Sequence, residues 1–127
     1  MKRLIPLALL LSSLSVALTA LPQPRGFVND FVGVLTPSQA EEMEKLAAEV
    51  QEKTGAQIAV LTIDSLDGEV LEEYAHRVAS TWQLGRKGKD DGALLLIAKN
   101  DRKMRIEVGY GLEASLTDIA TKRILDN

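Results

Sequence analysis

The chain contains no cysteine, one histidine and only five aromatic residues (one Trp, two Tyr, two Phe). The absence of cysteine excludes disulfides, thiol catalysis, thiolate zinc sites and lipid attached through a thiol. A single histidine also excludes a zinc site built from several imidazoles. The ligands that remain are oxygens, which favour Ca²⁺, or alternatively Mg²⁺ or Mn²⁺.

Positive charge is outnumbered by negative charge. The 15 Lys and Arg residues stand against 18 Asp and Glu residues, which gives a formal net charge of −3. A nucleic-acid partner requires a basic face to neutralise phosphates, so we expect none. A divalent cation fits this balance better. The sequence shows no internal repeat or low-complexity segment, and we expect a single, monomeric domain.

The one long apolar run lies at the N-terminus. Lys2 and Arg3 precede the uncharged residues 4–20, which end in small residues before Leu21. This arrangement is typical of a secretory signal peptide, and we place the cleavage after Ala20. The alternative is an uncleaved membrane anchor, although the run is slightly shorter than the ~20 residues of a spanning helix. In either case we expect the remainder to be exported: periplasmic, secreted, or on the extracytoplasmic face of a membrane.

We expect the domain to span residues 27–127, and local sequence signals define its first half. Residues 21–26 are a predicted linker, because two prolines and a glycine prevent regular structure there, and a short docked segment should follow at residues 27–31. A helix is predicted to begin at the N-cap Thr36, with a capping box, and to end at Gly55. Its apolar face comprises Met43, Leu46, Ala47 and Val50.

The second half alternates strand and helix patterns. The sequence predicts a strand over residues 57–63, a helix over residues 70–84, and a hairpin of residues 93–98 and 103–108. The first arm is continuously apolar, as in a central strand. The second alternates with charges and should be exposed on one side, and the turn should place Asn100-Asp101 at positive φ. The pattern indicates an α/β domain with a mixed sheet carrying helices on its faces.

Acidic residues gather near the open end of this hairpin. Asp90 and Asp91 precede Gly92, and Asp118 opens a predicted helix over residues 117–126. One of two neighbouring aspartates can bind a cation while the other caps or turns the backbone. Gly92 permits carbonyl oxygens to approach the same ion. Asp30 lies in the docked segment. Taken singly, each aspartate is most often a turn or cap residue.

Three other features are less specific. Gly109 to Ala114 fits a loose dinucleotide-binding fingerprint, but it follows the second arm of a hairpin, so we interpret its glycines as a chain reversal. His76 lies within a helix and has no visible partner in the sequence. Arg102 and Arg105 are able to bind a phosphate, but covering the exposed side of the hairpin is the commoner role.

Taken together, these segments resemble the TPM domain family, found in exported bacterial proteins and thylakoid-lumen proteins. The matching segments are Val28 to Phe31 with Val34-Leu35, Thr54 to Ile58 with Val60, Trp82, Gly85, Asp90 to Leu96, Arg102, Arg105 to Glu113, and Leu116-Thr117-Asp118. The family usually has Asn where this chain has Asp91.

The resemblance implies a three-layer αβα sandwich with a mixed central sheet. It also implies an acidic cleft near the sheet edge that holds Ca²⁺ or a similar divalent ion. Asp30, Asp90, Asp91 and Asp118 are the positions that would carry this cleft. The family domain normally continues beyond the position of Asn127, so we expect the C-terminal part of the domain to be missing.

Two functions follow as alternatives. The first is a metal-binding domain that acts in membrane-protein or envelope assembly and maintenance, with Ca²⁺ fixing the loops for a membrane-protein partner. The second, implied by family members described as acid phosphatases, is metal-assisted hydrolysis of phosphomonoesters, with Arg102 stabilising the developing charge. The sequence offers no nucleophile-and-base pair, which favours the first, and no catalytic residue is assigned.

Overall fold

The computed structural model describes residues 20–114 and residue 125. The elements follow the order β1 (Val28–Asp30), α2 (Pro37–Thr54), β2 (Gln57–Ile63), α3 (Leu71–Thr81), β3 (Gly92–Ala98), β4 (Lys103–Val108) and the 3-10 helix η1 (Tyr110–Leu112). Across this part of the chain, no helix combines the length and apolar character needed to cross a membrane. The predicted leader and the predicted helix at residues 117–126 fall almost wholly outside the described residues.

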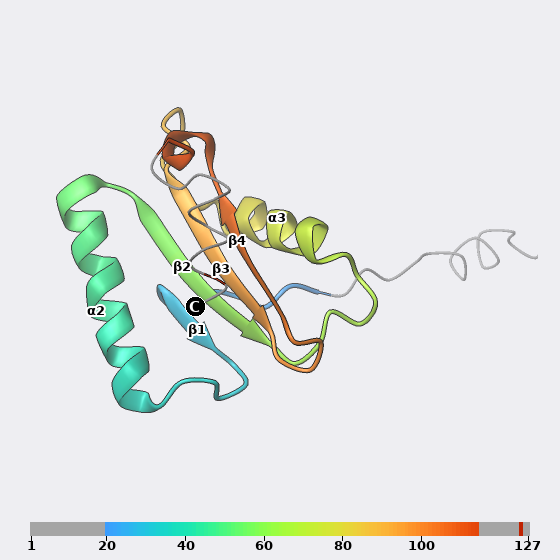
Figure 1. Cartoon of the computed structure of the whole chain (residues 1–127). Coiled ribbons are helices and arrows are strands. Elements are labelled where there is room, and N and C mark those ends of the chain that lie inside the picture. Colours follow the sequence, from blue (N-terminus) through green and yellow to red (C-terminus); the bar gives the residue numbers. More distant parts are fainter. Residues whose placement is uncertain (1–19, 115–124, 126–127) are drawn as a thin grey trace, which may run out of the picture.

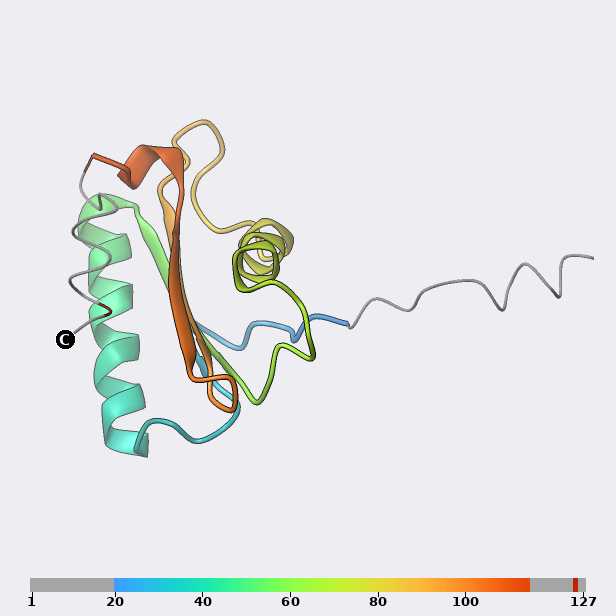
Figure 2. The ribbon, with the colours of Figure 1, turned by 45° about the vertical axis from the view of Figure 1, so that its right-hand side comes forward.

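A mixed four-stranded sheet forms the middle layer, with strand order β1-β2-β3-β4. The first three strands are parallel and β4 is antiparallel to β3. The two helices lie on opposite faces of this sheet, α2 on one and α3 on the other (Figures 1 and 2). The predicted mixed sheet and αβα layering are therefore confirmed.

The buried core lies between the sheet and α3. Leu61, Leu94 and Leu96 are fully buried and meet Ala75 and Val78 of α3 in one apolar cluster. Removing these side chains from water supplies the main stabilisation of the fold. The continuous apolar run of β3 is explained by its central position, as predicted.

The opposite face is covered less completely. Of the predicted apolar stripe of α2, only Ala47 is buried, and Leu46 is 55% exposed. The reason is that α2 packs against β1 and β2 and not across the whole sheet. The expected face is present, but most of it is only partly buried.

The ends of α2 follow local signals. Thr36 Oγ1 accepts from the backbone N–H of Gln39 at 3.1 Å, and the Gln39 side chain accepts from the backbone N–H of Thr36 at 3.0 Å. Gly55 ends the helix with φ 82°, a left-handed conformation that glycine adopts at low cost. Both predictions, the capping box and the glycine stop, are confirmed.

Helix α3 is shorter than predicted. It ends at Thr81, three residues before the expected Leu84. Gln83 has φ 53°, and Leu84 then turns back towards the apolar cluster. The helix therefore ends before the left-handed Gln83 and not at the predicted stop, Gly85.

The hairpin turn also differs from the prediction. Positive φ occurs at Arg102, at 54°, and not at Asn100 or Asp101. The Asp101 carboxylate instead accepts from the backbone N–H of Leu66 at 2.6 Å. Asp101 thereby ties the hairpin turn to the β2–α3 connection.

The charged side of β4 faces α3 and is only partly open to solvent. Arg105 is paired opposite Leu96 and Glu107 opposite Leu94, so their side chains leave the same sheet face as those buried leucines. Both charged residues are half-buried. The expected exposed side is thus partly covered, while Met104, on the other face, is 45% exposed.

The docked segment predicted at residues 27–31 is confirmed, with β1 at its centre. The Glu44 carboxylate of α2 accepts from the backbone N–H groups of Phe27 at 2.9 Å and Val28 at 2.7 Å. One helical side chain therefore satisfies two backbone donors at the start of the short edge strand.

We predict that Glu44→Ala lowers the free energy of unfolding by about 2 kcal/mol, because hydrogen bonds to a charged acceptor are lost and two donors lose their partner. Glu42→Ala, at an exposed position of the same helix, is the matched control and should change it by no more than about 0.5 kcal/mol. Urea unfolding measures both. Equal effects of the two substitutions would contradict the assigned role of Glu44.

Candidate functional site

The loop before β3 is held by a pairing between Arg86 and Asp91. One Asp91 carboxylate oxygen accepts from the Arg86 backbone N–H at 2.7 Å, and the other accepts from its guanidinium at 2.8 and 2.6 Å. The same guanidinium donates to the Thr54 carbonyl, the last residue of α2, at 3.2 Å. Asp91 is 6% exposed. Its carboxylate therefore joins the loop to the end of α2.

These contacts also set the protonation of Asp91. The Arg86 guanidinium and then the Arg86 backbone N–H hold the pKa of Asp91 below its ordinary value of 3.8, against the opposing effect of desolvation. The carboxylate is therefore charged at neutral pH and already bonded on both oxygens. A predicted metal ligand is thus engaged by an arginine of its own loop.

Close backbone packing fixes the loop on its other side. The N–H of Gly109 donates to the Gly92 carbonyl at 2.8 Å, and the N–H of Gly111 donates to the Asp90 carbonyl at 2.9 Å. A Cβ at Gly111 would collide with the Lys89 carbonyl. The glycines therefore permit two loops to touch. The carbonyls that we expected to face an ion are hydrogen-bonded within the protein.

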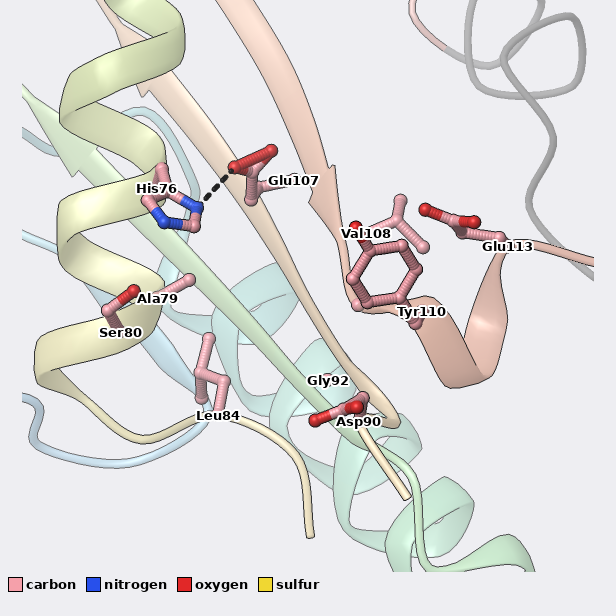
Figure 3. A pocket seen from close by; sticks show the side chains of 11 residues that line it. His76, Ala79, Ser80, Leu84, Asp90, Gly92, Glu107, Val108, Tyr110 and Glu113 are labelled. Atoms are coloured by element: carbon pink, nitrogen blue, oxygen red, sulfur yellow. Dashed lines mark ion pairs between the residues drawn. The ribbon is translucent and has the colours of Figure 1, made fainter. Parts of the chain in front are cut away.

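Asp90 is placed differently from its neighbour. It has φ 49°, a left-handed conformation that Asp tolerates better than most residues. Among the described residues its carboxylate has no hydrogen-bond or ion-pair partner. The side chain lines a cleft of about 340 Å³ together with Glu107, Glu113 and Tyr110 (Figure 3).

The cleft has acidic and apolar walls. Its lining residues are His76, Ala79, Ser80, Leu84, Asp90, Gly92, Glu107, Val108, Gly109, Tyr110 and Glu113, with no Lys or Arg among them. Tyr110 is 80% exposed. The open end of the hairpin is thus a hollow lined by three carboxylates, and of the four predicted site residues only Asp90 is among the lining residues.

His76 has a partner that the sequence did not reveal. Its Nδ1 lies 3.4 Å from Oε2 of Glu107 (Figure 3). The other Glu107 oxygen accepts from Arg105 at 3.0 Å. Glu107 is thereby held against the cleft wall. The hairpin register could have revealed this partner from the sequence, because the four-residue turn places the Glu107 side chain on the α3 side of the sheet.

Asp30 lies at the opposite end of the sheet. It pairs with Thr62 of β2, which in turn pairs with Ile97 of β3, six residues beyond Asp91. At ~3.3 Å per residue this separates the two aspartates by about 20 Å. Asp30 therefore cannot share one ion with Asp90 or Asp91.

The Asp30 carboxylate organises the turn before α2. It accepts from the backbone N–H groups of Val34 at 2.9 Å and Leu35 at 2.8 Å, and from Thr62 Oγ1 at 2.7 Å. Desolvation raises the pKa of Asp30, but the hydrogen bonds from Leu35, Val34 and Thr62 outweigh it and leave the pKa below 3.8. This is the role of a turn residue.

A closed metal site does not form from the described residues. Within residues 20–114 and 125, no three His, Asp or Glu side chains gather closely enough to hold one ion. Asp118 lies outside the described residues. Asp90 and Glu113 are the two cleft carboxylates without partners in this part of the chain. Two carboxylates supply at most a small part of the 6–8 oxygens that Ca²⁺ takes.

Comparison with known proteins gives a family match. The family model described as the TPM domain matches residues 28–127. The N-terminal domain of a protein from P. gingivalis is similar at 31% identity and a TM-score of 0.72, covering 79% of this chain and 64% of that one, so the match spans less than two thirds of its length.

A second solved structure shows the fold alone. The N-terminal domain of a protein from Corynebacterium glutamicum is 18% identical with a TM-score of 0.61, covering 88% of this chain and 70% of that one. No curated protein matches the chain.

We predict that Asp91→Asn makes the melting temperature less sensitive to acid. Because the folded pKa of Asp91 is depressed, its carboxylate stabilises the fold above roughly pH 5, and this stabilisation is lost as the pH falls through about 4 towards the folded pKa. The variant should melt lower at pH 7 and fall less between pH 5 and 3.

Asp64→Asn, at an exposed position after β2, is the matched control and should keep the wild-type pH slope. Thermal unfolding followed by circular dichroism at several pH values gives both slopes. If Asp91→Asn and wild type lose the same number of degrees between pH 5 and 3, the Arg86 pairing is not what sustains the loop.

Proposed function

The chain belongs to the TPM domain family, and on that premise we propose that it is an exported binding module whose acidic cleft holds a divalent cation, Ca²⁺ in the first instance. The observation that carries the proposal is the contrast between two neighbouring aspartates. Asp91 is bonded to Arg86, whereas Asp90 projects into a cleft with a second unpartnered carboxylate, Glu113. Leader-like residues 1–20 support the exported location.

The sparse ligand set defines what the ion would do. Asp90 and Glu113 supply at most part of a calcium shell, so the remaining positions are open to water or to oxygens of a partner. We infer that the ion bridges the cleft to a membrane protein during its assembly or maintenance. Tyr110, exposed at the cleft, adds an apolar surface with a polar tip to that contact.

Phosphomonoester hydrolysis finds less support in the geometry. The cleft carries three carboxylates and no Lys or Arg lines it, so it repels a phosphate dianion when no cation is present. Arg102, the expected charge stabiliser, lies beyond the far end of β4, about 20 Å from Gly109 along the strand. Among the described residues no Lys or Arg lines this cleft, and Arg105 contacts it only through its pairing with Glu107.

We predict that Ca²⁺ raises the melting temperature of the wild type, because an ion that binds only the folded state stabilises it by RT ln(1 + [ion]/Kd), about 1.4 kcal/mol at ten times Kd. The double variant Asp90→Asn with Glu113→Gln should lose this rise. The control pair Asp64→Asn with Glu42→Gln removes the same charges away from the cleft and should retain it.

Asp91→Asn distinguishes the cation site proposed here, Asp90 with Glu113, from the site predicted from the sequence, which includes Asp91. Because its oxygens are bonded to Arg86, Asp91 is not a ligand but only positions Asp90. The variant should therefore still show a Ca²⁺-dependent rise, from a lower starting temperature and with a higher half-saturating concentration. Absence of any rise in the wild type, or an undiminished rise in the cleft variant, would contradict the proposal. Isothermal titration calorimetry at constant ionic strength distinguishes specific binding from charge screening.

A further inference from the structure

The segment that follows the predicted cleavage point is docked onto the domain. Leu21 packs against the apolar cluster, and the Pro22 carbonyl accepts from the indole Nε1–H of Trp82 at 2.9 Å. Leu21 and Pro22 are half-buried, whereas Ala20 is exposed. Residues 21–24, here called the N-terminal strap, have no regular structure but are held in place.

The strap lies on the α3 side of the sheet (Figure 2). Trp82 directly follows α3, and its backbone N–H donates to the Val78 carbonyl, so the indole is fixed by the helix end. Pro24, Phe27, Trp82 and Leu84 line a small pocket of about 260 Å³ beside the strap. The strap therefore closes over a structured part of the domain and is not a free tether.

This docking restricts access to the Ala20–Leu21 bond. An enzyme that cuts a chain must first bind it in extended form, using main-chain hydrogen bonds on both sides of the bond. Here the two residues on the carboxyl side are held by the core and by Trp82. Cleavage of the folded chain would require the strap to detach, which costs the free energy of that local opening.

We propose that the Trp82–Pro22 contact makes removal of the leader depend on the folding state of the domain. Water cleaves the Ala20–Leu21 amide to give a carboxylate on Ala20 and an amine on Leu21 while the strap is free. Once the strap docks, the bond is protected. Chains that fold first keep the apolar residues 4–20 as an anchor, with the domain held directly at the membrane surface.

The inference uses the exported location proposed above but not the cation site, so failure of Ca²⁺ binding leaves it intact. It also accounts for both interpretations of the leader, a cleaved signal peptide and an uncleaved membrane anchor. Cleaved and anchored forms are the two outcomes of one competition, between processing and strap docking.

The test compares cleavage of the folded full-length chain, in detergent micelles, with cleavage of a synthetic peptide of residues 10–27. A purified bacterial signal peptidase and mass spectrometry give both rates. We expect the peptide to be cut after Ala20 and the folded wild type to be cut at least tenfold more slowly. Trp82→Phe, which removes the N–H donor and keeps an aromatic ring, should recover at least half of that difference on a logarithmic scale.

Ile63→Val is the control for general destabilisation, since it removes one methylene from the core cluster and leaves the hydrogen bond between Trp82 and Pro22 in place. It should leave the wild-type rate nearly unchanged. Equal rates for peptide and folded wild type, a peptide not cut after Ala20, or equal acceleration by Ile63→Val and Trp82→Phe would each overturn the proposal. Circular dichroism confirms that both variants are folded at the assay temperature.

Discussion

The pairing of Arg86 with Asp91 is the constraint on which the candidate site depends. It joins three parts of the molecule: the end of α2 through the Thr54 carbonyl, the connecting loop, and the beginning of β3. The Asp91 carbonyl also accepts from the backbone N–H of Gln57 at the start of β2. Because Asp91 is fixed in this way, Asp90 takes a left-handed conformation and projects into the cleft. A structural carboxylate thus positions its neighbour.

The aspartates therefore have different roles in the structure, whereas composition alone would assign the same role to each. Asp30 and Asp91 accept several hydrogen bonds each and hold turns at opposite ends of the sheet, about 20 Å apart. Asp90 and Glu113, by contrast, face a hollow without a cationic lining. A negative cleft with few ligands favours a hydrated cation shared with a partner over a closed metal site. That contrast supports the proposed binding module.

Much of the fold was predictable because its signals are local. A capping box, a helix-ending glycine and runs of alternating or continuous apolar residues gave the bounds of α2 and β2 and the mixed sheet. The site was less predictable because its contacts depend on register and loop path. The pairing of Glu107 with His76 requires the hairpin register. The engagement of Asp91 requires a loop that returns Arg86 to it, and the separation of Asp30 requires the order of the strands.

The most direct test of the account is an amide NMR titration of the ¹⁵N-labelled protein with Ca²⁺ at fixed ionic strength. We expect saturable shifts concentrated at Asp90, Tyr110 and Glu113, with little change at Asp30 and an intact Arg86 Nε–H signal from the Asp91 pairing. Shifts centred on Asp30, loss of the Arg86 signal on addition of Ca²⁺, or no saturable shift at the cleft would contradict it.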